Sequence, residues 1–133
     1  MGAIHQQGRD ILRKAIKGTA GNTVTHVGMA TDQTAFDDAQ TALDPANGGA
    51  GNLLIKSATA TDADAGAVIQ TDFTISINGD SEMTNKNIYT IGLQKGATRT
   101  DNISRTVRSQ PIGVQAGDSY TIGARLKVQD DSA

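Results

Sequence analysis

Two histidines, His5 and His26, are the only imidazole groups of this chain, which has no cysteine. Histidine is the commonest general acid or base near neutral pH, and cysteine supplies nucleophiles, metal ligands and disulfides. His26 falls in an alternating, strand-like segment, where a packed or partly exposed position is expected. Arg9, four residues after His5 on a predicted helix, repels cations, so we expect His5 to be a surface residue. The sequence therefore predicts no catalytic and no metal-binding residue.

Motifs for nucleophilic and phosphate chemistry are also missing. Neither Gly-x-Ser-x-Gly nor Ser-x-x-Lys occurs, and the phosphate-binding pattern Gly-x-x-x-x-Gly-Lys is absent. Glycines cluster at positions 48–51, but this cluster precedes a predicted strand, whereas a dinucleotide-binding loop opens a helix. We therefore expect a protein that is not an enzyme and that needs no cofactor.

Two loop carboxylates, Asp62 and Asp64, are similar to the start of a calcium-binding loop. The pattern is not completed, because Gly66 stands where the third carboxylate is needed. A sugar-binding surface would also use aromatic side chains, of which the chain has two Phe, two Tyr and no Trp. A carbohydrate- or calcium-binding β-sandwich module remains the alternative from another functional class.

A single amphipathic helix is predicted at the amino terminus, from Ile4 to Lys17. Its apolar positions follow the i, i+4, i+7, i+8 spacing of one helical face: Ile4, Gly8, Ile11, Leu12, Ala15 and Ile16. Gly18 suits the position just after a helix, and basic residues in the last turns complement the helix dipole.

Basic residues of this helix form the one candidate partner-binding surface. Arg9, Arg13 and Lys17 are spaced by four and share a face, and the candidate site comprises Arg9, Ile11, Leu12, Arg13, Lys14 and Lys17. One interpretation is a solvated flank of a helix that packs on a sheet. The other is an arm that docks into an acidic, partly apolar groove of another protein.

The rest of the sequence has the period-two alternation and Gly-rich turns of strands, at 23–30, 52–59, 69–77, 87–94, 103–108 and 120–128. The connections are too short for helical crossovers, which favours antiparallel pairing. We therefore predict a mainly β protein, an antiparallel, jelly-roll-like β-sandwich of residues 19–133 with a helical arm of residues 1–18. Two further predictions are a short helical turn within Thr34–Leu43 and an inward or strand-edge charge at Arg105 that discourages stray pairing.

The composition limits the core and the partners. With 133 residues and four aromatic side chains, the core is lean, which favours a narrow sandwich or help from a partner surface. The 12 basic and 14 acidic residues nearly cancel, so no general attraction to nucleic acid or to acidic membranes is expected. No run of 18 apolar residues occurs, so we expect neither a signal peptide nor a membrane span.

The order of several short motifs resembles a diverse group of small structural proteins from the virions of tailed bacteriophages. After the helix, the motifs are Thr-His-Val-Gly-Met-Ala-Thr at 25–31, Thr-Ala-Leu at 41–43, Asn-Ile-Tyr-Thr-Ile-Gly-Leu at 87–93, Ser-Arg-Thr-Val at 104–107, Gln-Pro-Ile at 110–112 and Gly-Asp-Ser-Tyr-Thr-Ile at 117–122. The chain departs from the group in its charged run at 80–86, where such proteins often carry a turn of small residues.

The resemblance implies a non-enzymatic role in the virion, after synthesis in the host cytoplasm. Members of the group serve as head decoration or cement proteins, or as tail fibre and tail tip components. A short chain without a fibrous extension favours the capsid surface, where a cement protein bridges neighbouring subunits. The implied partners are the major capsid protein or other virion proteins and further copies of this chain, a trimer being favoured. A tail fibre, tail tip or tail adaptor role is the alternative.

Overall fold

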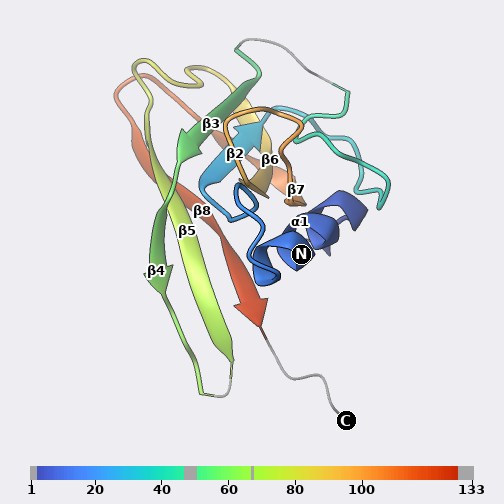
Figure 1. Cartoon of the computed structure of the whole chain (residues 1–133). Coiled ribbons are helices and arrows are strands. Elements are labelled where there is room, and N and C mark those ends of the chain that lie inside the picture. The colour runs from blue at the N-terminus through green and yellow to red at the C-terminus, as the bar shows by residue number, and fades with distance from the viewer. Residues whose placement is uncertain (1–2, 47–50, 67, 129–133) are drawn as a thin grey trace.

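The computed structural model describes residues 3–46, 51–66 and 68–128, which form two antiparallel β-sheets and one helix (Figure 1). The elements are β1 (Ala3–Ile4), α1 (Gln6–Ile16), β2 (His26–Ala30), β3 (Leu53–Ser57), β4 (Thr59–Asp62), β5 (Ile69–Asn78), β6 (Asn87–Gln94), β7 (Ser104–Gly113) and β8 (Ser119–Val128). The predicted mainly β, antiparallel sandwich with one amino-terminal helix is confirmed.

The larger sheet has the strand order β1-β7-β6-β2-β3, and the smaller sheet has the order β4-β5-β8. Strand β2 lies between β3 and β6, with Gly28 paired to Ile55 on one side and to Gly92 on the other. In the smaller sheet β5 and β8 pair over ten residues each, from Ile69 opposite Val128 to Asn78 opposite Ser119. The centre of each sheet therefore depends on strands that are far apart in the sequence.

One side of the sandwich is closed by the chain itself. Only Ala58 separates β3 from β4, so the chain passes directly from the larger sheet into the smaller one. On the same side, the Lys56 Nζ of β3 donates a hydrogen bond to the Ser76 carbonyl of β5, at 2.7 Å, and forms an ion pair with Glu82 at 3.1 Å. The two sheets are thus tied together along this side.

The core between the sheets is built mostly from aliphatic side chains. Its buried members are Ile11, Val27, Met29, Phe73, Ile75, Ile77, Met83, Ile88, Ile91, Leu93, Ile103, Val114 and Ile122. Along β5, the inward alternation of Phe73, Ile75 and Ile77 follows the prediction. Ile69, on the same face, is 55% exposed. Figure 1 shows why: this end of β5 projects beyond the larger sheet.

Three strands, β5, β6 and β8, agree closely with the alternation in the sequence. Strand β2 begins at His26 rather than at residue 23, the strand predicted at 52–59 is divided between β3 and β4, and Ile4, predicted to begin the helix, lies in β1. Strand β6 has the predicted bounds, whereas β7 continues through Pro111 to Gly113. The predicted helical turn within Thr34–Leu43 is wrong, because this segment is an irregular loop. There the Asp37 carboxylate accepts a hydrogen bond from the Ala39 amide, and the Gln40 side chain accepts one from the Asp37 amide. Such bonds satisfy the backbone without a helix.

Helix α1 ends at Ile16, and Gly18 follows its C-cap Lys17 as a terminating glycine, as predicted. Gly18 has a φ of 80°, a left-handed conformation that glycine adopts without strain. The Gly18 amide donates to the Ala15 carbonyl at 3.0 Å, and the Thr19 amide donates to the Lys14 carbonyl at 2.9 Å. These two bonds form a Schellman motif, which satisfies the last carbonyls of the helix.

Candidate functional site

The apolar half of the predicted partner-binding surface faces the core of its own domain. Ile11 is only 3% exposed and belongs to the core, and Leu12 packs against that core. Ile16, the last residue of the predicted apolar face, is instead 88% exposed. Ile11 cannot contact another protein without opening the fold, and Leu12 is partly buried. The predicted arm is therefore packed into the domain.

Three of the four basic residues of that surface are paired within the chain. Arg9 forms a two-bond ion pair with Asp38, at 2.8 and 3.0 Å, and Lys14 and Arg13 both pair with Asp10, Lys14 at 2.9 Å. The Arg9 guanidinium holds the pKa of Asp38 below its usual value. Exposed ion pairs of this kind are weak, because solvent screens the charges, so they do not prevent these side chains from exchanging partners.

His5, predicted to be a surface residue, is fully buried and caps α1. Its Nδ1 accepts a hydrogen bond from the Gly8 amide at 3.2 Å, so in the neutral ring Nε2 carries the proton and donates to Asn102 Oδ1 at 2.6 Å. Burial lowers the pKa of His5 and outweighs the opposing effect of the Asn102 hydrogen bond. The prediction is wrong because Asn102, 97 residues away, is brought beside the helix only by the fold.

Asn102 connects the start of the helix to the hairpin between β6 and β7. Its Nδ2 donates to the Gln94 side chain at 2.6 Å and to the Ser104 carbonyl at 2.9 Å. Beside it, the Gln7 side chain donates to the Thr100 and Asn102 carbonyls, at 2.8 and 3.0 Å. This network fixes the first turn of α1 on the hairpin.

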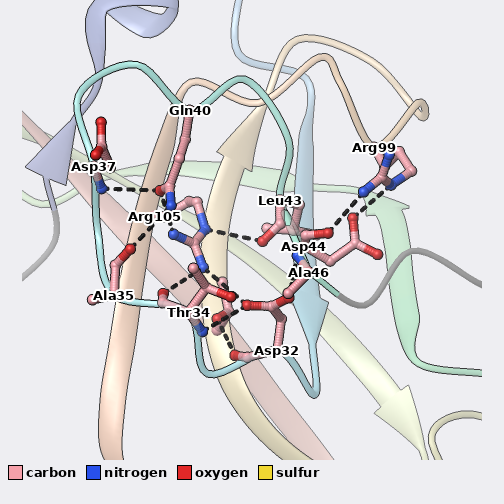
Figure 2. Close-up of polar contacts among 11 residues, drawn as sticks. Asp32, Thr34, Ala35, Asp37, Gln40, Leu43, Asp44, Ala46, Arg99 and Arg105 are labelled. Atoms are coloured by element: carbon pink, nitrogen blue, oxygen red, sulfur yellow. Dashed lines mark hydrogen bonds and ion pairs between the residues drawn. The ribbon is translucent and has the colours of Figure 1, made fainter.

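Arg105 organises the loop of residues 32–46 (Figure 2). Its guanidinium donates to the Leu43 and Thr34 carbonyls, both at 3.0 Å, and to Gln40 Oε1 at 2.6 Å, and pairs with Asp32 at 3.5 Å. The predicted strand-edge role is wrong, because the side chain is buried and β1 pairs with β7 at this position. Arg105 instead supplies the donors that the loop carbonyls need.

Asp32 is the acidic partner in this cluster. Its carboxylate accepts hydrogen bonds from the Thr34 amide at 2.7 Å and the Ala46 amide at 2.8 Å. Burial by itself raises the pKa of Asp32, but these bonds and the Arg105 charge outweigh it, so the net pKa is lowered. Nearby, Arg99 donates to the Asp44 carboxylate and carbonyl, both at 2.7 Å. Figure 2 shows these side chains surrounded by the loop, and their role is to hold it.

The remaining predicted sites are not brought together. Asp62 ends the exposed strand β4, and the Asp64 carboxylate accepts a hydrogen bond from the Gln70 amide at 3.1 Å. His26 lies half-buried in β2, with Nδ1 2.7 Å from the hydroxyl of Thr25. Across residues 3–46, 51–66 and 68–128, no three His, Asp or Glu side chains gather as a metal site would require. Of the glycine cluster at 48–51, only Gly51 lies within the described residues.

The side of the sandwich opposite the β3–β4 connection is open. A groove of about 530 Å³ runs between β8 on one side and β6, β7 and the end of β1 on the other. Its lining residues are Ile4, Ile91, Leu93, Ser104, Thr106, Arg108, Gly123, Ala124, Arg125, Leu126 and Lys127.

No family model, curated protein or solved structure matches this chain.

The sequence contained one signal for the groove, the alternation of small or apolar and basic residues at positions 123–127. That signal predicts a half-buried strand, but it does not show that β8 is the last strand of its sheet. Among the described residues no helix is long and apolar enough to span a membrane.

Proposed function

We propose that this protein is a structural subunit that acts by binding other protein chains. The observation that carries the proposal is the open side of the sandwich, where an apolar groove runs beside the edge strand β8. Unpaired strand edges and apolar grooves are common protein-binding surfaces. This fits the lean core of the chain, in which Phe73 is the one buried aromatic residue among those described.

Three buried polar side chains, whose pKa values are shifted by burial and by their partners, support the same function. Arg105, Asp32 and His5 are buried, and their hydrogen bonds hold a loop and a helix against the larger sheet. Catalytic groups need a path to substrate, so these groups are better suited to maintaining a rigid shape. A rigid shape favours protein binding, because less conformational entropy is lost on association.

The virion of a tailed bacteriophage is the place we propose for this subunit, on the basis of the motif resemblance. On the head surface the protein would act as a decoration or cement protein that bridges subunits of the major capsid protein. Many weak contacts repeated around a shell add up through avidity. We also propose that the protein forms a small oligomer, a trimer, on the shell.

Purified particles provide the test. The phage that carries this sequence is grown, heads and tails are separated, and the protein is quantified in each fraction by mass spectrometry. We expect it in the heads at a fixed ratio to the major capsid protein. Presence only in tails would overturn the cement role, and absence from both fractions would overturn the virion role.

A further inference from the structure

The smaller sheet leaves one strand position empty opposite β7. Strand β5 packs against β2, and β8 packs against β6, so each faces a strand of the larger sheet. The larger sheet continues beyond β6 with β7 and β1. The smaller sheet has no strand beyond β8 within residues 3–46, 51–66 and 68–128. The groove lies in this gap, because its lining comes from β8, β6, β7 and Ile4.

The floor of the groove suits alternate apolar side chains of an extended segment. The lining residues that still expose apolar surface are Ile4 of β1 and Ala124 and Leu126 of β8, which are partly buried, whereas Ile91 and Leu93 of β6 are buried. Small residues of β8, Gly123 and Ala124, leave room for a neighbouring backbone. In a strand, every second side chain points to the same face. A strand beside β8 would therefore place alternate side chains on this floor.

The edge of β8 can supply backbone hydrogen bonds to such a segment. Every residue from Ser119 to Val128 is paired with β5 on one side only. In an antiparallel pair, the residues of an edge strand alternately direct their amide and carbonyl groups inward and outward. Addition of a strand to an exposed edge is an established mode of peptide recognition.

The charges around the groove indicate an acidic partner. All charged residues in its lining are basic, namely Arg108, Arg125 and Lys127, although the chain as a whole carries a net charge of −2. Arg125 is paired with Asp72, at 2.6 Å, while Arg108 and Lys127 are exposed and have no carboxylate partner among the described residues. These two cations are available to an incoming carboxylate.

We propose that this groove binds an extended segment of a partner protein as a fourth strand of the smaller sheet. The segment has apolar side chains at alternate positions, which pack on Ile4, Ala124 and Leu126, and acidic side chains that reach Arg108 or Lys127. The inference rests on the proposed function, since it names the surface through which the subunit binds other chains.

The probe is a labelled ten-residue peptide that alternates valine and glutamate, titrated with the full chain at low salt. Binding is followed by fluorescence anisotropy, and amide exchange of residues 123–127 is measured with and without peptide. We expect saturable binding and slower exchange in β8. A peptide with lysine in place of glutamate, and one with N-methylated amides along one edge, should each bind at least tenfold more weakly.

A matched pair of variants locates the site. Lys127→Glu reverses a charge in the groove, and Lys17→Glu makes the same change at the exposed end of α1. We expect the first to weaken peptide binding about tenfold and the second less than twofold, with both variants retaining the spectrum of the folded protein. Equal effects of the two variants would overturn the proposal.

Two other results would also overturn it: no saturable binding of the valine–glutamate peptide, or equal binding of its N-methylated form. If sedimentation shows a stable oligomer that Lys127→Glu dissociates, a second copy of the chain occupies the groove and the partner segment is refuted. A negative peptide experiment would contradict the groove proposal alone, because the particle fractionation tests the virion role independently. The groove proposal and the virion proposal can therefore fail separately.

Discussion

Arg105 and His5 are single residues that each join parts of the chain far apart in sequence. Arg105 reaches the loop of residues 32–46, whose Leu43 carbonyl is 62 positions away, and His5 reaches Asn102. In both cases a buried polar group has its hydrogen bonds satisfied by the fold. Removing one member of such a cluster takes a buried hydrogen-bond or ion-pair partner from the others, which is costly.

We predict that Arg105→Met lowers the free energy of unfolding by about 3–5 kcal/mol, because the Asp32 carboxylate and two loop carbonyls lose a buried donor. Urea denaturation measures the change. Arg108→Met, on the same strand but exposed, is the control and should change stability by about 0.5 kcal/mol or less. Similar losses in the two variants would show that the Arg105 cluster is not important for stability.

His5 should make stability depend on pH below about 6.5, its ordinary pKa in an unfolded chain. Because burial lowers the pKa in the folded state, only the unfolded state takes up the proton as the pH first falls below that value. Stability is therefore complete above pH 6.5 and decreases on acidification, by at most about 1.4 kcal/mol per pH unit.

Melting temperatures between pH 8 and pH 4.5 test this effect, above the range in which Asp32 and Asp38, with their lowered pKa values, take up protons. His5→Asn retains a capping oxygen and should remove the dependence, whereas His26→Asn should leave it in place. An unchanged slope in His5→Asn would assign the dependence to other groups.

Residue-level predictions from the sequence failed where the partner was distant. The burial of His5 was not predicted, because it depends on Asn102 and the hairpin that carries it. Histidine is also not among the preferred N-cap residues, so the cap had no clear signal. Arg105 was recognised as a charge on an inward strand face, yet the loop that pairs with it has no regular pattern.

At the level of elements, α1 is held close to the larger sheet by a glycine. A Cβ atom added at Gly8 would lie 1.9 Å from the Ile103 carbonyl oxygen, inside van der Waals contact. The helix can approach the backbone of the β6–β7 hairpin only because position 8 has no side chain. Gly8 lies on the predicted apolar face of the helix, and the close approach to Ile103 is the reason for its small size.

The stability of a Gly8→Ala variant shows whether helix propensity or packing dominates at this position. Propensity alone predicts that alanine stabilises the helix by about 1 kcal/mol. The clash with Ile103 predicts the opposite sign, a loss of about 1–3 kcal/mol. Thermal or urea denaturation decides between them, with Gln6→Ala as an exposed helical control. A more stable Gly8→Ala protein would mean that the helix packs less closely than described.

Elements with strict period-two alternation were the ones that the sequence predicted best. Strands β5, β6 and β8 were found nearly to the residue, since one face of each is buried and the other is not. The loop of residues 32–46 was not, because its shape depends on side chains such as Asp37 and Arg105 that bond to backbone groups.

For the whole molecule, the structure changes the expected result of removing the amino terminus. As a detached arm, residues 1–17 would be dispensable for folding. In the structure this segment supplies Ile11 to the core, His5 to the Asn102 network and β1 to the sheet edge. We therefore predict that deletion of residues 1–17 lowers the melting temperature by roughly 10 °C or more.

Calorimetry of the deleted chain measures this change. Arg13→Ala with Lys17→Ala, which removes exposed charges and leaves the packed residues in place, is the control and should melt within about 2 °C of the parent. A deletion that melts like the parent would restore the interpretation of residues 1–18 as an independent arm.

The open side of the sandwich could not be deduced from strand patterns alone. Alternation predicts that a segment is a strand with one buried face, but the order of strands depends on pairings such as β5 with β8 across about 50 residues. The direct passage from β3 to β4 through Ala58 fixes which side is closed, and the groove that we propose as a binding surface lies on the opposite side.

The pairing of β5 with β8 also has a consequence for biosynthesis. Strand β8 ends at Val128, so β5 has only β4 as a partner in the smaller sheet until almost all the described residues have been made. At translation rates of about 5–20 residues per second, the roughly 50 residues from the end of β5 to the end of β8 take about 3–10 seconds to synthesise. During that interval the apolar face of β5 has no β8 beside it on the ribosome. Chaperones that shield nascent chains would therefore act mainly on β4 and β5.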